Sequence, residues 1–209
     1  MADRGRSVDR HRRGGGADRQ VVDQQAGDGL DVLVAATREV EEDPGAGVLA
    51  EPGRERRLFR LEKASLGVAV CEDLWNDKTF WKERLYPHDP ADELIELGAS
   101  VLVSINASPF NKAKMGMRCD MVRHRAKLAG LPIVFVNLVG ANDGIIFDGA
   151  SIVADCRGEI ILQAPPFEEF FGTVDLDCGV ADSYCLPGND IETVHRALVL
   201  GIHDYARKN

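Results

Sequence analysis

The chain has 209 residues, of which 44% are hydrophobic and 28% are charged, a composition typical of a globular protein with a sizeable core. The formal net charge of −9 argues against a nucleic-acid-binding protein, because such proteins usually present a basic face. No apolar run is long enough to span a membrane, and the arginine-rich N-terminus lacks the apolar core of a secretion signal.

The cysteines indicate a reducing compartment. Their number is odd and no two of them form a CxxC pair, which argues against a disulfide framework or a zinc site and favours the cytoplasm. His195 and His203 lie eight residues apart without further ligands nearby, so we interpret them as surface or packing histidines and expect no metal site. The cysteines are Cys71, Cys119, Cys156, Cys178 and Cys185.

The first fifty residues differ from the rest of the chain. No aromatic residue precedes Phe59, and residues 4–29 are mostly Arg, Asp, Gly and Gln. Such a segment buries little apolar surface, so we expect it to be disordered or loosely held. Residues 30–34 read as a strand or one helical turn, and Asp43-Pro44-Gly45 reads as a turn.

From residue 51 onward, apolar runs alternate with helical patterns, which predicts an α/β sheet with crossover helices. Asp89-Pro90 is a helix start, and Gly98 and Gly130 are helix ends. The residues of the second helix that share one face (Met115, Cys119, Val122, Ala126) predict a core stripe, with Arg118, Arg123 and Arg125 around the rest. The expected elements are a hairpin of residues 58–61 and 66–70, helices 91–97 and 112–129, and strands 100–105 and 133–139.

The pattern then changes to short strands, which we expect to be antiparallel additions to the same sheet: residues 144–149, 151–154, 159–163 and 172–176. Asp148-Gly149 is a strong hairpin-turn signal. Residues 190–209 predict one helix, in which Val194, Leu198 and Ile202 share a face.

Cys71 follows a predicted buried strand and precedes Glu72, Asp73 and Trp75. A strand that ends in a reactive side chain can place it at the carboxyl edge of a sheet, where open α/β folds have their sites. From spacing alone, Cys71 is more often a small buried hydrophobe.

Four blocks in order resemble the carbon–nitrogen hydrolase (nitrilase) superfamily and, within it, the amidase domains of glutamine-dependent NAD synthetases. The blocks are Val-Cys-Glu-Asp-Leu-Trp (70–75), Asn-Ala-Ser-Pro-Phe (106–110) with Lys114 and Arg118, residues 136–151, and residues 196–209. The last block resembles the helix that links the amidase domain to the synthetase domain. One departure is Val-Gly-Ala-Asn-Asp, where the family has Val-Gly-Gly-Gln-Asp.

The resemblance implies a four-layer α-β-β-α sandwich, here incomplete at the N-terminus. It implies that Cys71 attacks the glutamine amide, forms a thioester and releases ammonia, with the Glu72 N–H near the oxyanion. By position, Ser108 and Lys114 match the glutamine-binding serine and its basic partner. Without the resemblance, Ser108 is a turn residue before Pro109 and Lys114 is a solvated lysine.

The family's catalytic Glu and Lys precede the cysteine in blocks that residues 1–50 do not reproduce. Glu39, Glu41 and Glu42 form a solvated charge run, and Lys63 lies on the turn into the Cys71 strand, so we assign the two roles to none of them. A truncated gene product, with its first residues from a shifted reading frame, is the hypothesis that this pattern suggests.

We therefore divide the chain into an atypical segment (1–50), the C-terminal part of an amidase domain (51–189) and a linker helix (190–209) toward a synthetase domain. ATP and magnesium are expected only for that other domain, since the chain has no glycine-rich phosphate loop, and no cofactor is expected here. The expected partners are glutamine, the synthetase domain and further copies of the chain. Two alternatives are an inactive remnant and a free-standing amidase or nitrilase with another substrate.

Overall fold

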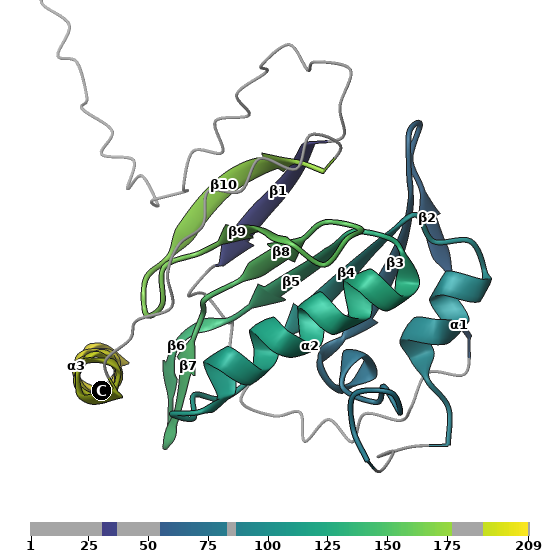
Figure 1. Cartoon of the computed structure of the whole chain (residues 1–209). Helices are drawn as coiled ribbons and strands as arrows, with labels where there is room; N and C mark the ends of the chain where they lie inside the picture. The colour runs from purple at the N-terminus through teal and green to yellow at the C-terminus, as the bar shows by residue number, and fades with distance from the viewer. Residues whose placement is uncertain (1–30, 37–54, 83–86, 177–189, 209) are drawn as a thin grey trace, which may run out of the picture.

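The computed structural model describes residues 31–36, 55–82, 87–176 and 190–208 (Figure 1). Within these ranges, one sheet and two helices form the centre of the molecule, and two smaller sheets and a C-terminal helix pack around it. The elements are β1 (Asp31–Ala36), β2 (Leu58–Arg60), β3 (Ser65–Val70), the 3₁₀ helix η1 (Cys71–Leu74), α1 (Pro90–Glu96), β4 (Val101–Asn106), α2 (Lys114–Ala129), β5 (Ile133–Asn137), β6 (Val139–Asn142), β7 (Ile145–Asp148), β8 (Ile152–Ala154), β9 (Ile160–Gln163), β10 (Phe170–Asp175) and α3 (Asp190–Lys208).

The central sheet has six strands in the order β2-β3-β4-β5-β8-β9. Strands β3, β4 and β5 are parallel, and α1 and α2 form the crossovers between them, as the alternation of patterns predicts. The predicted hairpin is confirmed, because β2 pairs antiparallel with β3. Strands β8 and β9 extend the sheet as antiparallel strands.

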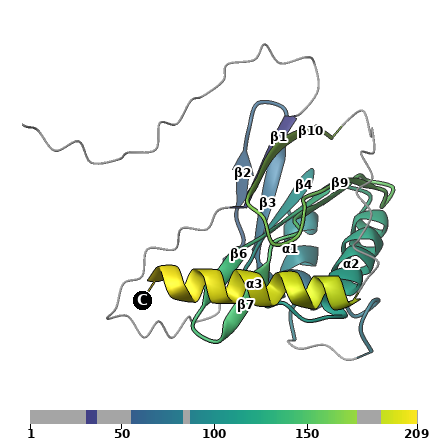
Figure 2. The ribbon, with the colours of Figure 1, turned by 90° about the vertical axis from the view of Figure 1, so that its left-hand side faces the viewer.

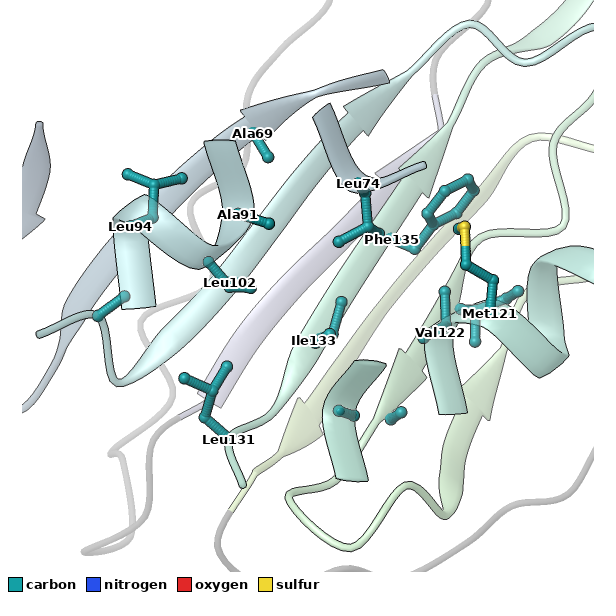
Figure 3. Packing of buried hydrophobic residues seen from close by; sticks show 14 of the residues in the cluster. Ala69, Leu74, Ala91, Leu94, Leu102, Met121, Val122, Leu131, Ile133 and Phe135 are labelled. Atoms are coloured by element: carbon teal, nitrogen blue, oxygen red, sulfur yellow. The ribbon is translucent and has the colours of Figure 1, made fainter. Parts of the chain in front are cut away.

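Each face of the central sheet carries a cluster of buried apolar residues. Helices α1 and α2 cover one face, which Figure 1 shows in front of the sheet; there Leu102, Ile133 and Phe135 pack against Leu94 of α1 and Met121 of α2 (Figure 3). On the other face, Val101, Val134 and Val153 cluster with Val174 of β10, which pairs with β1. The described residues thus give a helix layer, a six-stranded sheet and a two-stranded sheet, in agreement with the incomplete α-β-β-α sandwich.

The structure corrects two predictions about the later strands. Strands β7 and β10 do not extend the central sheet. Strand β7 pairs with β6 in a separate two-stranded sheet, and β10 pairs with β1, which is a strand rather than a helical turn. Asp148-Gly149 does not close a hairpin: β7 pairs with β6 around Asp143 and Gly144, while β8 pairs with β5 and β9. Asp148 is instead fully buried, and Gly149 (φ 62°) redirects the chain into the central sheet.

Helix α3 packs against the β6–β7 hairpin, and Figure 2 shows it in front of these two strands. Its buried residues are Thr193, Ala197, Leu200 and Asp204, and the carboxylate of Asp204 accepts a hydrogen bond from the Ala141 N–H (2.8 Å). The one long C-terminal helix that the sequence predicts is therefore present.

The remaining predictions for the first half of the chain, including the disorder of residues 4–29 and the turn at Asp43-Pro44-Gly45, lie outside the described residues. The division at residues 50 and 189 stays a prediction. No helix in the described parts of the chain is long and apolar enough to cross a lipid bilayer.

Candidate active site

The carboxyl ends of the three parallel strands define the candidate site. In the register of the sheet, Val70 of β3 pairs with Ile105 of β4, and Asn106 of β4 pairs with Asn137 of β5. The residues that follow these strands therefore leave the sheet at one shared edge. Cys71 follows β3 directly and Ser108 follows β4 after one intervening residue, so the sheet brings the two predicted site residues to that edge.

Cys71 occupies a strained backbone position. It is half-buried, it begins η1, and its φ angle of 46° lies in the left-handed region that non-glycine residues rarely adopt. Residues held in this region cost on the order of 1–3 kcal/mol and cluster at functional sites. At this φ angle the chain changes direction sharply at the end of β3. Cys71 is therefore the residue at which β3 turns into η1.

The turn at Cys71 is held from both sides. The Asp73 carboxylate accepts a hydrogen bond from the Val70 N–H (2.9 Å), and the Trp75 N–H donates to the Glu72 carbonyl (2.9 Å). Leu74 has no exposed surface and belongs to the helix-side core (Figure 3). These contacts anchor a four-residue helix that would not be stable alone.

Ser108 has a buried hydroxyl that is not satisfied by the described protein. Its backbone N–H donates to Asn137 Oδ1 (2.9 Å), which fixes the loop after β4. Only 1% of Ser108 is exposed, and its Oγ has no hydrogen-bond partner among the described residues. A buried hydroxyl without a partner costs about 1–3 kcal/mol, so this oxygen is suited to bind a polar group that enters the site.

Lys114 starts α2 and reaches the segment that follows Cys71. Its Nζ lies 5.2 Å from the centroid of the Trp75 ring, within cation–π range, and Trp75 in turn stacks on Trp81 with 5.8 Å between the ring centroids. Lys114 is thus half-buried against an aromatic pair rather than a freely solvated residue. The structure brings it to the η1 side of the edge.

A fully buried ionic network lies behind the Ser108 loop. The Arg118 guanidinium of α2 pairs with the Asp148 carboxylate of β7, and neither side chain has exposed surface. Asn137 connects this pair to Ser108: its Nδ2 donates to Asp148 (3.4 Å) and to the Gly149 carbonyl (2.9 Å), while its Oδ1 holds the Ser108 N–H. Sequence analysis missed the burial of Arg118, although its place beside Cys119 on the core stripe was a signal.

A second buried arginine ties α2 to the segment after η1. Arg125 lies within ion-pair distance of Asp77 (3.3 Å), Asp89 (3.0 Å) and Asp92 (2.8 Å). Burial alone would raise the pKa of Asp77, but hydrogen bonds from the Thr79 side chain and backbone and the charge of Arg125 outweigh it and hold that pKa below its usual value.

The other described cysteines and the histidines of α3 do not belong to this edge of the sheet. Burial raises the pKa of the Cys119 thiol, which is 5% exposed in the core beneath α2, whereas Cys156 is exposed. His195 and His203 are exposed on α3, with His203 Nδ1 3.0 Å from Asp204. Within the described ranges, no cluster of three or more His, Cys, Asp or Glu side chains is arranged to hold a metal ion. Glu39, Glu41 and Glu42 lie outside those ranges, and Lys63 lies in the bend between β2 and β3.

Comparison with known proteins places this chain in a family. The model of the carbon–nitrogen hydrolase family matches residues 39–184, most of the chain and all of the edge described above. The chain therefore belongs to the carbon–nitrogen hydrolase family.

Curated relatives and solved structures agree with this assignment. Glutamine-dependent NAD(+) synthetases of Synechocystis sp. and Rhodobacter capsulatus are 37% identical over 155 residues and 39% identical over 170 residues, which cover 72% and 74% of this chain. The structure of the glutamine-dependent NAD+ synthetase from Acinetobacter baumannii in complex with ADP superposes with a TM-score of 0.64, at 28% identity over 75% of this chain. The chain spans only 28% and 29% of the length of the two curated relatives and 28% of the solved chain.

Proposed function

We propose that this chain carries the part of a glutamine-dependent NAD synthetase that hydrolyses the amide of glutamine, with Cys71 as the nucleophile. The observation that carries the proposal is the position of Cys71: a half-buried cysteine at φ 46°, where β3 turns into η1, at an edge shared with Ser108. Family membership and the names of the relatives support this substrate class.

The reaction follows from thiol chemistry. Cys71 Sγ gives up its proton and attacks the side-chain amide carbon of glutamine. The C–N bond of the resulting tetrahedral intermediate then breaks, and the NH2 group leaves as ammonia after it takes up the proton that the thiol lost. The glutamyl thioester then reacts with water, which gives glutamate and returns the thiol. The Glu72 N–H is the backbone donor adjacent to the nucleophile, where oxyanion stabilisation is needed. No step requires a metal or an organic cofactor.

Ser108 and Lys114 are proposed to bind the substrate. The unsatisfied Ser108 hydroxyl would gain a partner when a glutamine polar group enters, which offsets the cost of its burial. Lys114 carries a positive charge beside Trp75 and suits the α-carboxylate of glutamine. The ammonia would serve an ATP-dependent, magnesium-dependent amidation by a synthetase domain, the activity expected from the names of the relatives.

Covalent labelling tests the proposal. We expect a glutamine-analogue electrophile such as a diazoketone to modify Cys71, as mapped by peptide mass spectrometry, and free glutamine to slow the reaction. Ser108→Ala and Lys114→Met should weaken glutamine protection about tenfold or more while they leave reaction with iodoacetamide unchanged.

Cys156 is the matched control, because it is exposed and lies away from the edge. Glutamine should not protect it. Folded protein in which Cys71 is not labelled, or is labelled at the same rate as Cys156 with no effect of glutamine, would support the inactive remnant instead.

A further inference from the structure

Asn137 is a buried polar residue at the shared edge of the strands, and it has no role yet in the reaction proposed for Cys71. It ends β5, opposite Asn106 in the register of the sheet, and it has no exposed surface. A buried amide costs free energy unless its donor and acceptor groups are bonded, and in Asn137 both groups have partners. These partners show what the side chain holds in place.

The buried ion pair fixes the direction of the Asn137 amide. Its Nδ2 donates to the Gly149 carbonyl (2.9 Å) and to the Asp148 carboxylate (3.4 Å), and both of these groups are acceptors. The Arg118 guanidinium binds the other carboxylate oxygen of Asp148 and holds that side chain in position. The NH2 group of Asn137 must therefore face these acceptors. Its Oδ1 then faces the opposite way, where it accepts from the Ser108 N–H (2.9 Å).

The backbone of Ser108 is restrained on both sides. Asn137 holds its N–H, and the ring of Pro109 restricts the residue before it to extended conformations. The loop is held again two residues later, because the Phe110 N–H donates to the Ile146 carbonyl (2.7 Å). With its backbone fixed, Ser108 can move its hydroxyl only by rotation between a few side-chain rotamers.

We propose that Asn137 is a positioning residue of the glutamine site. Its side-chain carbonyl holds the Ser108 N–H, and the Ser108 hydroxyl is thereby set in place to bind a polar group of the substrate beside Cys71. A group that is already in place binds without the entropic cost of ordering it. Asn137 does not touch the substrate and acts through Ser108. The inference rests on the proposed function, since it concerns the binding of glutamine at that site.

Glutamine protection of Cys71 against a glutamine-analogue electrophile tests the inference. Asn137→Ala should raise the glutamine concentration for half-protection about tenfold or more, the loss of roughly one hydrogen bond to the substrate. The rate with iodoacetamide should stay within about twofold, because Asp73, and not Asn137, holds the Cys71 turn. A variant that was only less stable would change neither value while it stays folded, as checked by circular dichroism.

Asn106→Ala is the matched control. Asn106 is also buried at the end of its strand, but its Nδ2 donates to the carbonyls of Ser104 (2.8 Å) and Val136 (3.0 Å) rather than to the Ser108 loop. It should lose stability yet keep glutamine protection within about twofold.

A double variant tests whether Asn137 acts through Ser108. In the Ser108→Ala background, Asn137→Ala should weaken glutamine protection by less than about twofold further, because the hydroxyl that it positions is already gone. Losses that simply multiply in the double variant would overturn the inference.

Hydrogen exchange of the unmodified chain gives a test that does not require any variant to fold. The Ser108 amide proton should exchange at least about a hundredfold more slowly than in an unfolded chain. Asn137→Ala should accelerate exchange at Ser108 but not at Phe110, whose N–H is held by Ile146. Fast exchange at Ser108 in the unmodified chain would overturn the inference.

The outcomes separate this inference from the proposed function. If glutamine does not protect Cys71 in the unmodified chain, both fail. If glutamine protects the unmodified chain and folded Asn137→Ala equally well, or if Asn106→Ala loses as much protection as Asn137→Ala, the proposed function stands and the positioning role of Asn137 is refuted.

Discussion

At the scale of single residues, the fully buried Arg118–Asp148 pair is the most consequential polar feature near the edge. It lies behind Asn137, which in turn holds the Ser108 loop. Two of the three Arg118 guanidinium nitrogens have no hydrogen-bond partner among the described residues, so the Asp148 carboxylate is the main compensation for a buried positive charge.

Replacement of Asp148 by asparagine should therefore be costly. The change removes the counter-charge but keeps the size of the side chain, and we expect the free energy of unfolding to fall by about 3–5 kcal/mol. Urea denaturation at pH 7 measures this. Asp143→Asn, an exposed residue in the β6–β7 turn at φ 50°, is the control and should change stability by less than about 0.5 kcal/mol. Equal effects of the two substitutions would contradict the role of the buried pair.

Asp77 makes stability depend on pH. Its pKa lies below the unfolded value, so its contribution is fully present above the unfolded pKa of about 4 and is lost as the pH falls through the folded pKa. We expect the free energy of unfolding to decrease from pH 5 to pH 3, and to decrease less in Asp77→Asn. At pH 7 this variant should lose about 1–3 kcal/mol, because Arg125 keeps Asp89 and Asp92. Asp120→Asn, exposed on α2, should retain the slope of the unmodified protein; an unchanged slope in Asp77→Asn would refute the assignment.

At the scale of elements, the contact between β3 and α1 depends on a glycine. A Cβ on Gly67 would meet Leu102 Cδ2 at 2.9 Å and the Cβ atoms of Ala99 and Leu94 at 3.1 Å. The absence of a side chain lets α1 lie directly on the strand that ends at Cys71. This close packing positions the strand that carries the nucleophile.

We expect Gly67→Ala to lower the free energy of unfolding by about 1–3 kcal/mol, because the tightly packed core has to shift. Gly116→Ala in α2 is the opposite case: nothing lies within 4 Å of the added methyl group, and alanine is the better helix former, so stability should rise by about 0.5–1 kcal/mol. Thermal or urea unfolding of the two variants measures the difference, and a stabilised Gly67→Ala would show that α1 does not pack as described.

Most of the helices and strands of the central sheet could be predicted from the sequence, whereas the buried ion pairs could not. The strands β3, β4 and β5, the capped helix α1 and the helix α2 follow from local apolar runs and end signals, and they agree with the structure. The burial of Arg118 and Arg125 was not predicted from the sequence. Their ion-pair partners, Asp148 and Asp89, lie 30 and 36 residues away along the chain. The hairpin at Asp148-Gly149 was wrong for the same reason: a distant arginine draws Asp148 into the core, and no local pattern reports that.

At the scale of the whole molecule, the central sheet is covered unevenly. The β1–β10 sheet packs on the side of β5, β8 and β9, whereas near β3 and β4 the same face leaves Val70 and Ile105 61% and 54% exposed. The pairing of β1 with β10, more than 130 residues apart, also lay beyond sequence reasoning, since only tertiary contact selects it. Site roles for Cys71, Ser108 and Lys114 came from resemblance rather than from spacing.

Polar substitution on this exposed area should be tolerated. The double variant Val70→Thr, Ile105→Thr keeps β-branched side chains and should change the free energy of unfolding by about 1 kcal/mol or less, with reduced binding of a hydrophobic dye. Val134→Thr on the buried part of the same face is the control, and it should cost more than about 1 kcal/mol. A large loss of stability in the double variant would mean that this area is covered in solution.

The central claim is that the Cys71 sulfur reacts with the amide carbon of glutamine, and the covalent intermediate tests it most directly. Protein mixed with glutamine and quenched rapidly in acid should carry a glutamyl adduct by intact mass, and fragmentation should place it on Cys71. Cys71→Ala should carry none and release no ammonia. Ammonia release that persists in Cys71→Ala, or an adduct that maps to Cys119 or Cys156, would contradict the account.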